Sequence, residues 1–595
     1  MNPNNLNTQS SNSFLELRSY FEILKNKNKL KKDILKTIRI AFLADCSLQH
    51  LSTILGILGN ERGLNLEIYQ GDFDSIEMEV IDPKSKFYAF DPQFVIIIQQ
   101  VQNLKSRFYG AISPDIVDEK ILNITTIWDS IRKNLNIPII QSTFVIPAER
   151  TFGNYELMVP NSLGSRTVEI NSRIIVEAQK RKDILINDIN YLASEFGRKN
   201  WRDEKLWLMA KAPCALEGLP ILAKNILDII FAATGRITKC VILDLDNTLW
   251  GGIIGDDGLE GIRLGDFEDG YAFSQLQQFV LALKNRGIIL AVCSKNEISN
   301  ALLPFQHHPE MILKEADIAA FIANWNDKAS NISEIQKILN IGFDSMVFLD
   351  DNPFERNLVK GILPDVLVPE LPEDPTNYLS YLATLNLFEA TTFSSADLER
   401  SELYRVEAQR VQLKSNFDSV DDYLNSLDMQ INLERFNRFN LPRIAQLIQR
   451  SNQYNLTTKR YSEAECESLS LDFEHAFPFT LTLADKFGSY GLICVCILKF
   501  SGGDAYIDEF LMSCRVLQRG VEDYAMNRIF AEAKSKGVKK VIGSYIPSPK
   551  NSMVKDFYDK FKFKLIETSD LGVTTWTKDV DSYENIDTIM QSVGS

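Results

Sequence analysis

A strand-length apolar run in this chain of 595 residues ends in two aspartates two positions apart. The run is 240–243, and Asp244 and Asp246 follow it. In an open α/β sheet, ligands bind beyond the carboxyl ends of the strands. Two carboxylates at such an end can reach one phosphoryl group and one Mg²⁺, one attacking while the other handles the proton. Aspartates also end strands because they suit turns, so this pair alone leaves both interpretations open.

Three further polar elements follow in order, each at the end of an apolar run or the start of a helix. Ser294 follows the run 287–293, Lys328 ends the string NWNDK, and Asp350 and Asp351 follow the run 345–349. Singly, such residues are commoner in turns and on solvated helices than in active sites. The ordered set resembles the four-motif signature of the haloacid dehalogenase superfamily, phosphotransferases in which an aspartate is transiently phosphorylated.

This resemblance implies a role for each motif residue. Asp244 would be the nucleophile, and Asp246 would act as general acid and base through its side chain. The implied Mg²⁺ ligands are Asp244, Asp246 (through its main-chain carbonyl), Asp350 and Asp351. Ser294 would hydrogen-bond the phosphoryl group and Lys328 would neutralise it. Such roles agree with phosphoryl transfer, which needs positioning and charge neutralisation more than elaborate covalent chemistry.

The spacing of the motifs predicts an open site. About 50 residues separate Asp244 from Ser294 and about 34 separate Ser294 from Lys328, too few for a cap domain beside the required helices and strands. An open site suits a large substrate, such as a group carried on a protein.

Longer strings narrow the resemblance to the FkbH-like family. They are 243–258, 308–311, 324–328, 348–356, 450–458 and 512–515. Membership would imply an enzyme that takes 1,3-bisphosphoglycerate, removes phosphate, and leaves a glyceryl group as a thioester on the phosphopantetheine arm of an acyl carrier protein. Such products often become polyketide extender units.

A thioester-forming enzyme of this kind calls for a cysteine that holds the glyceryl group. Cys514 is the first candidate, because the neighbouring guanidinium of Arg515 would favour its thiolate. Cys293 is the second, because it adjoins Ser294. A buried structural cysteine remains an alternative for both, since free cysteines are among the most buried residues.

The C-terminal region resembles a GNAT-type acyltransferase, in which main-chain amides at a helix start bind the coenzyme A pyrophosphate. Gln518 and Lys562 stand where that fold usually has glycines. These departures argue against the binding of free coenzyme A. They do not argue against the pantetheine arm of a carrier protein, because that arm has only one phosphate. Tyr558 would be the acid for a leaving thiolate, although core tyrosines are commoner. Arg515 and Tyr558 are therefore expected acyl or carrier contacts.

The N-terminal region resembles an SGNH hydrolase in the order of its expected elements. The string 45–47 stands in place of the usual Gly-Asp-Ser, and Asp203 lacks the histidine of an Asp-x-x-His pair. Without that base a serine is not activated, so we expect a non-hydrolytic docking or scaffolding domain.

The expected fold is α/β and multi-domain: an SGNH-like domain, a capless haloacid-dehalogenase-type Rossmannoid domain and a GNAT-like α+β domain. Alternating strands and helices precede the proline-rich string LPDVLVPELPEDP, and apparent antiparallel strands follow it. The expected divisions are a polar tail with a leading helix (1–35), the SGNH-like domain (36–235), the phosphatase-like domain (236–385), linker helices with the GNAT-like domain (386–580) and a C-terminal tail (581–595).

Composition excludes several classes of function. A net charge of −15 without a long basic run argues against nucleic acid and anionic membranes. Eight cysteines without a CxxC pair argue against zinc sites and disulfides. No apolar run approaches the roughly 20 residues that span a bilayer, so we expect a cytoplasmic protein.

Two alternatives to the carrier-loading enzyme are a capless Mg²⁺-dependent phosphatase acting on a phosphoprotein or metabolite, and a non-enzymatic adaptor. The intact motif set disfavours the adaptor.

Overall fold

The computed structural model describes residues 18–30, 36–110, 116–393, 404–406 and 419–593. The polar tail expected before residue 18, most of the linker between 394 and 418, and the last two residues lie outside this range. The chain divides into two compact units, 1–231 and 232–595, which are taken separately below. No helix in the described ranges has the length and apolar character needed to cross a membrane.

The first unit contains a five-stranded parallel sheet of strand order β2-β1-β3-β4-β5. Its strands are β1 (Lys36–Ala44), β2 (Leu64–Gln70), β3 (Phe94–Ile98), β4 (Ile139–Ser142) and β5 (Ile184–Asn187). All five side chains of β3 are buried, as expected for a central parallel strand covered on both faces.

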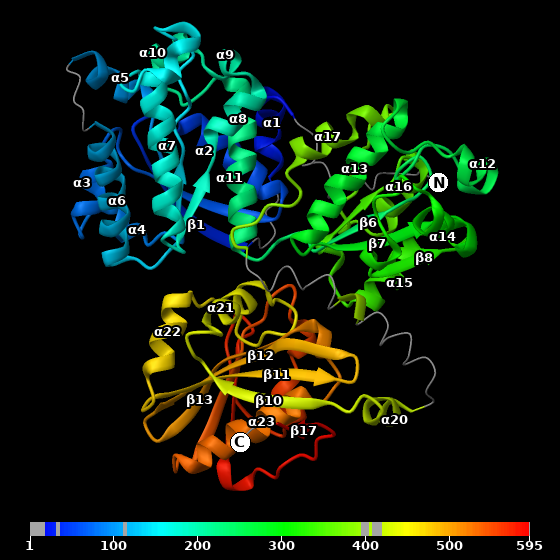
Figure 1. Cartoon of the computed structure of the whole chain (residues 1–595). Helices are drawn as coiled ribbons and strands as arrows, with labels where there is room; N and C mark the ends of the chain where they lie inside the picture. The colour runs from blue at the N-terminus through cyan, green and yellow to red at the C-terminus, as the bar shows by residue number, and fades with distance from the viewer. Residues whose placement is uncertain (1–17, 31–35, 111–115, 394–403, 407–418, 594–595) are drawn as a thin grey trace, which may run out of the picture. The chain divides into compact units, whose positions relative to one another are not determined.

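Helices connect these strands and cover the sheet (Figure 1). The longer ones are α2 (Gln49–Glu61), α5 (Val101–Gly110), α6 (Ile116–Asn134), α7 (Leu163–Gln179), α8 (Ile189–Phe196) and α11 (Leu219–Ala233). The shorter ones are α1 (Tyr20–Lys25), α3 (Ile76–Ile81), α4 (Lys86–Phe90), α9 (Arg198–Trp201) and α10 (Glu204–Ala210). Trp128 of α6 and Ile174 of α7 pack in one buried cluster with Val95 of β3.

The second unit begins with a four-stranded parallel sheet of order β8-β7-β6-β9. Its strands are β6 (Cys240–Leu243), β7 (Ile289–Ser294), β8 (Ala320–Ala323) and β9 (Met346–Leu349). Cys240 and Ile242 pack in one buried cluster with Ile332 and Ile335 of α15 (Lys328–Leu339).

Helices make up most of the connections in this sheet (Figure 1). They are α12 (Ile254–Gly261) and α13 (Glu268–Asn285) between β6 and β7, α14 (Ile298–His307) between β7 and β8, α15 between β8 and β9, then α16 (Pro353–Ile362) and α17 (Tyr378–Leu385). Asp327 caps α15 by accepting from the Ser330 amide, and Asn352 caps α16, with Pro353 in its first turn. Residues 240–323 are described throughout, and neither of the first two connections contains a cap domain.

The remainder of the second unit contains a mixed eight-stranded sheet of order β15-β16-β14-β13-β12-β11-β10-β17. Its strands are β10 (Gln430–Arg435), β11 (Ala476–Asp485), β12 (Gly488–Ser501), β13 (Asp504–Met512), β14 (Lys540–Tyr545), β15 (Lys564–Thr568), β16 (Thr574–Asp579) and β17 (Gln591–Ser592). Its helices are α20 (Val420–Asn425), α21 (Leu441–Arg450), α22 (Glu463–Leu471), α23 (Val521–Ser535) and α24 (Phe557–Lys560). Two parallel sheets and one mixed sheet confirm the predicted multi-domain α/β class.

The segment around Leu456 lies between β13 and β14, one of the two parallel strand pairs of the mixed sheet. β13 and β14 pair only over Ala505–Ile507, and beyond that point the chain around Leu456 lies between them. The Leu456 amide donates to the Phe510 carbonyl of β13 (3.1 Å), and its own carbonyl accepts from the Ile546 amide just after β14 (2.8 Å). A segment from outside the strand order therefore joins the two strands where they diverge.

Candidate active site

Three carboxylates converge at the carboxyl edge of the β6–β9 sheet. Asp244 directly follows β6, and Asp350 and Asp351 directly follow β9, its parallel neighbour. One oxygen from each of the three lies within 4.8 Å of the others. Asp350 is fully buried and Asp244 is nearly so. The strand ends therefore bring together the acidic residues that their sequence positions predicted.

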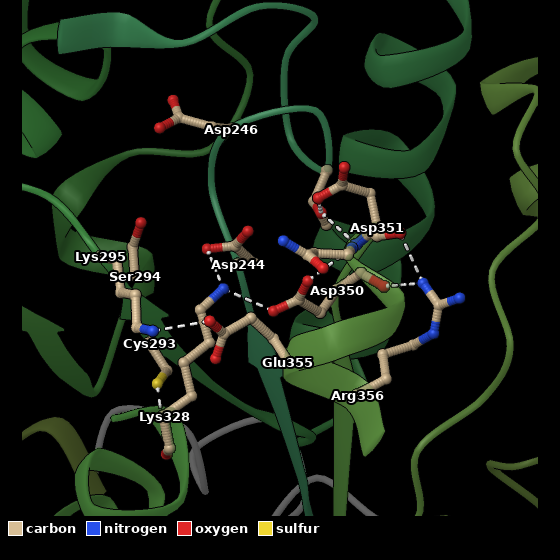
Figure 2. Close-up of polar contacts among 12 residues, drawn as sticks. Asp244, Asp246, Cys293, Ser294, Lys295, Lys328, Asp350, Asp351, Glu355 and Arg356 are labelled. Atoms are coloured by element: carbon tan, nitrogen blue, oxygen red, sulfur yellow. Dashed lines mark hydrogen bonds and ion pairs between the residues drawn. The ribbon is translucent and has the colours of Figure 1, made fainter. Parts of the chain in front are cut away.

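Lys328 supplies positive charge to this carboxylate cluster. It begins α15, is buried, and its Nζ lies 2.9 Å from Asp244 Oδ1 and also contacts Asp350 (Figure 2). Burial alone would lower the pKa of the Lys328 ammonium, but the attraction of Asp244 and Asp350 raises it. Lys328 is therefore a fixed cation beside Asp244.

The single positive charge of Lys328 does not balance the negative charges of the three converging carboxylates. Burial, and next the negative charge of Asp244, raise the pKa of Asp350 to about 7 despite the contact with Lys328. The same two causes raise the pKa of Asp351. Excess buried negative charge made of oxygen ligands is what a hard divalent cation neutralises.

Ser294 ends β7, which lies beside β6, and its side chain is buried. Asn296 links it to the second aspartate of the strand-end pair: its Nδ2 lies 3.3 Å from Ser294 Oγ and 2.8 Å from Asp246 Oδ2. The Ser294 carbonyl accepts from the Asn324 amide after β8, and the Leu349 carbonyl of β9 accepts from the Asp244 amide, so all four strand ends are connected at this edge.

Asp246 is held apart from the carboxylate cluster. Its Oδ1 accepts from the Trp250 indole Nε1 and from the Ile254 amide, each at 3.0 Å. With Asn296 on Oδ2, both carboxylate oxygens are hydrogen-bonded, and Figure 2 shows the group turned away from Asp244. The structure thus places the Asp246 side chain outside the group of three converging carboxylates.

The side chains of Arg356 and Thr248 form hydrogen bonds to the main chain of Asp350 and Asp351, just after β9. Arg356, on α16, donates from one guanidinium nitrogen to the carbonyls of Asp350 (2.8 Å) and Asp351 (2.6 Å). The Asp351 amide donates to Thr248 Oγ1 (3.1 Å). The sequence predicted no role for Trp250, Asn296 or Arg356. Two of them lie in strings that resemble the FkbH-like family, Trp250 in 243–258 and Arg356 in 348–356.

Cys293 and the C-terminal candidates lie in buried surroundings. Cys293 Sγ lies 3.8 Å from the Lys328 carbonyl, and burial raises the pKa of its thiol. Arg515 is buried and donates from Nε to Ser513 Oγ (3.1 Å). Tyr558 is fully buried in the core of the mixed sheet, and burial raises its pKa. Cys514 follows β13 in the turn Cys514–Val516, and its side chain lies outside the described atoms.

Asp45 and Asp203, which lie in the hydrolase-like strings of the first unit, and the nearby His50 of α2 have other hydrogen-bond partners. Asp45 accepts from the Gln100 amide (2.8 Å), and burial raises its pKa to about 6. Asp203 caps α10 by accepting from the Leu206 amide (2.9 Å). His50 is hydrogen-bonded to the Tyr20 hydroxyl, at 2.8 Å. These contacts give Asp203 and His50 structural roles.

Comparison with known proteins connects both units to one family. Residues 39–231 match the family model FkbH, N-terminal domain. A solved structure of the N-terminal part of the protein BF1531 from Bacteroides fragilis, "containing phosphatase domain complexed with Mg", is 38% identical to this chain. The match covers 63% of this chain and all of that one, with a TM-score of 0.60.

Weaker matches cover about a quarter of the chain. The ribosomal-protein-S18-alanine N-acetyltransferase from Escherichia coli is 13% identical (25% of this chain, 94% of that one, TM-score 0.21). The GNAT domain of S. lividans PAT is 18% identical (25% and 89%, TM-score 0.20). Among curated proteins no sequence matches. On the strength of the BF1531 match across its full length and of the N-terminal-domain match, the chain belongs to the FkbH-like family.

Proposed function

We propose that the chain is a Mg²⁺-dependent phosphatase that also transfers a glyceryl group to an acyl carrier protein. The observation that carries the phosphatase part is the convergence of Asp244, Asp350 and Asp351 with Lys328 at one edge of a parallel sheet. Presence of Mg²⁺ in the BF1531 structure supports the same proposal.

The donor set fits Mg²⁺. All three converging side chains offer carboxylate oxygens, the ligands that hard divalent cations prefer, and their burial leaves negative charge to be neutralised. When bound, Mg²⁺ would supply further charge neutralisation for the phosphoryl group. Asp244, Asp350 and Asp351 would hold it.

The protein's own groups can carry out a two-step hydrolysis. Asp244 attacks phosphorus through one carboxylate oxygen, the bond from phosphorus to the leaving oxygen breaks, and Asp246 gives that oxygen a proton. Water then attacks the aspartyl phosphate, returns a proton to Asp246, and releases phosphate and the Asp244 carboxylate. Lys328 stays charged throughout and offsets the charge of the transferring group.

The transfer part needs a reactive thiol, and the sequence makes Cys514 the first candidate, because it adjoins Arg515. All seven cysteines with described side chains are buried, and burial raises the pKa of each thiol. Burial argues against Cys293 as the acyl carrier, and the proposed acyl carrier is Cys514. Its thiolate would attack the acyl carbon of 1,3-bisphosphoglycerate and expel phosphate, and the pantetheine thiol of the carrier would then displace Cys514 from the thioester.

Intact-mass spectrometry of a phosphopantetheinylated carrier protein tests this proposal. The chain is mixed with Mg²⁺, 1,3-bisphosphoglycerate and the carrier, and a glyceryl adduct on the carrier is expected. With Asp244→Asn the adduct should keep its phosphate, and with Cys514→Ala it should not form. An unmodified carrier, together with phosphate release from simple esters, would contradict the transfer part and leave a phosphatase of other substrates.

The placement of Asp246 gives a separate prediction. Trp250→Phe removes one of its three hydrogen-bond donors while keeping a buried aromatic ring, so kcat for phosphate release should fall about tenfold or more, with a smaller change in KM. Trp325→Phe is the matched control, because that indole is exposed and bonds to Glu297. Equal kcat values for Trp250→Phe and the unchanged protein would show that the indole does not position Asp246 for catalysis.

A further inference from the structure

The proline-rich string LPDVLVPELPEDP (363–375) packs along one edge of the β6–β9 sheet. Its Leu367 amide donates to the Met346 carbonyl of β9 (3.0 Å), and the Leu367 carbonyl accepts from the Phe348 amide (2.8 Å). On its other side β9 pairs with β6. The string therefore adds a short extended segment to the sheet, directly beside the strand that leads to the acidic pair.

Three residues after Leu367, Glu370 binds the guanidinium of Arg356. Glu370 Oε2 accepts from Arg356 Nε (3.0 Å), and the other carboxylate oxygen contacts Lys360. The Glu370 amide donates to the Tyr381 hydroxyl (3.2 Å). The Glu370 side chain is 51% exposed, whereas Arg356 is buried. The proline-rich string thus supplies the negative charge that a buried guanidinium requires.

The other end of Arg356 reaches the main chain of the acidic pair. One nitrogen, Nη1, donates to the carbonyls of both Asp350 and Asp351, and Figure 2 shows both contacts. A charged donor shared by two consecutive carbonyls restricts the main chain between them. It thereby restricts the direction in which the two carboxylates leave the end of β9.

The charge of Arg356 and its contacts predict opposite effects on Mg²⁺. A guanidinium near a metal site repels a divalent cation, so its charge alone weakens the binding of Mg²⁺. A residue that orients metal ligands strengthens binding, and its loss usually costs about ten- to a hundredfold in metal affinity. The sign of the change in affinity therefore separates the two effects.

We propose that Arg356, held by Glu370, is a positioning residue that sets the Mg²⁺ affinity of the carboxylate cluster. It keeps the main chain of Asp350 and Asp351 in the conformation in which their side chains converge with Asp244. The role of the proline-rich string is then to hold Arg356. This inference rests on the proposed Mg²⁺-dependent function and adds the residues that tune its metal site.

Calorimetric titration of the full chain with Mg²⁺, at about pH 8 after treatment with EDTA, tests the inference. Arg356→Lys keeps the positive charge but cannot hold Glu370 and both carbonyls at once, so the dissociation constant for Mg²⁺ should rise about tenfold or more. Glu370→Ala releases Arg356 Nε and should raise the constant about threefold. At saturating Mg²⁺, kcat for phosphate release should return to within about threefold of the unchanged protein, with KM for the ester unchanged, because Asp244 and Lys328 are intact.

Lys360→Met is the matched control, because Lys360 lies on the same helix and its described partner is also Glu370. Its dissociation constant for Mg²⁺ should stay within about twofold of that of the unchanged protein. The inference is overturned if folded Arg356→Lys binds Mg²⁺ as tightly as the unchanged protein, or if Lys360→Met weakens binding equally. If Arg356→Lys does not fold, Glu370→Ala decides by the same comparison.

Two results with the unchanged protein separate this inference from the proposed function. A folded, unchanged protein that binds no Mg²⁺ would overturn the metal site and the inference together. One that binds Mg²⁺ but releases phosphate from no ester would overturn the proposed function, and the comparison of dissociation constants would still decide the role of Arg356.

Discussion

Replacing Asp244 by Asn is expected to lower kcat for Mg²⁺-dependent phosphate release by at least about a thousandfold. The substitution keeps the size of the side chain but removes the nucleophilic oxygen, one of three converging carboxylates, and a partner of Lys328. Phosphate release from a simple aryl phosphate, followed at saturating Mg²⁺, measures the effect.

An exposed acidic residue of the same sheet's first connection provides the control. Asp256→Asn changes the charge by the same amount at an exposed position of α12 that is not one of the three converging carboxylates, and should leave kcat within about twofold. If Asp244→Asn retains more than a tenth of the activity, the nucleophile is another group and the proposed reaction path is wrong.

The second large effect is the stabilisation of the protein by Mg²⁺ and its dependence on pH. Burial and the charge of Asp244 raise the pKa of Asp350 from 3.8 to about 7. The folded protein therefore holds a proton between about pH 4 and pH 7 that the unfolded chain has lost, and the stability that Asp350 contributes falls as pH rises through this window. Above about pH 7 the ionised cluster is least stable without a cation.

Mg²⁺ and this proton compete for the same carboxylates, so added Mg²⁺ should raise the unfolding temperature more at about pH 8 than at about pH 5.5. Mg²⁺ at a hundred times its dissociation constant stabilises by about 2.7 kcal/mol, which is several degrees for a domain of ordinary size. Thermal unfolding with EDTA and with Mg²⁺ at both pH values provides the measurement, and Asp350→Asn should flatten the difference. An equal Mg²⁺ effect at both pH values would contradict the buried-carboxylate explanation.

The acidic cluster and its lysine could be predicted from the sequence because strand ends and helix starts are local features. Asp244, Asp350 and Asp351 follow strands that pair in parallel, so their meeting depends only on that pairing. The surroundings of Cys293 could also have been predicted, because consecutive residues of a strand point to opposite faces. Its neighbour Ser294 takes the site face, and Cys293 joins the buried cluster under α15.

Partners that depend on side-chain orientation could not be predicted. Trp250 and Asn296 hold Asp246. Trp250 lies four residues after Asp246 but in a turn rather than a helix, and Asn296 lies 50 residues away, so neither contact follows from a periodic pattern. The burial of Glu355 is likewise invisible in sequence, because a glutamate in the first turn of a helix is normally a solvated residue that favours the helix dipole. Only packing shows that it is buried.

The segment around Leu456 between β13 and β14 has a consequence for the order in which the mixed sheet forms. Its partners are Phe510 and Ile546, so hairpins closing between neighbouring strands are not enough to complete the sheet. Contacts this distant in the chain close large loops before they add stability, and they slow folding. A fragment starting at β11 would leave the Phe510 carbonyl and the Ile546 amide without their strand partner. The smallest fragment of this sheet that folds autonomously should therefore begin before residue 454.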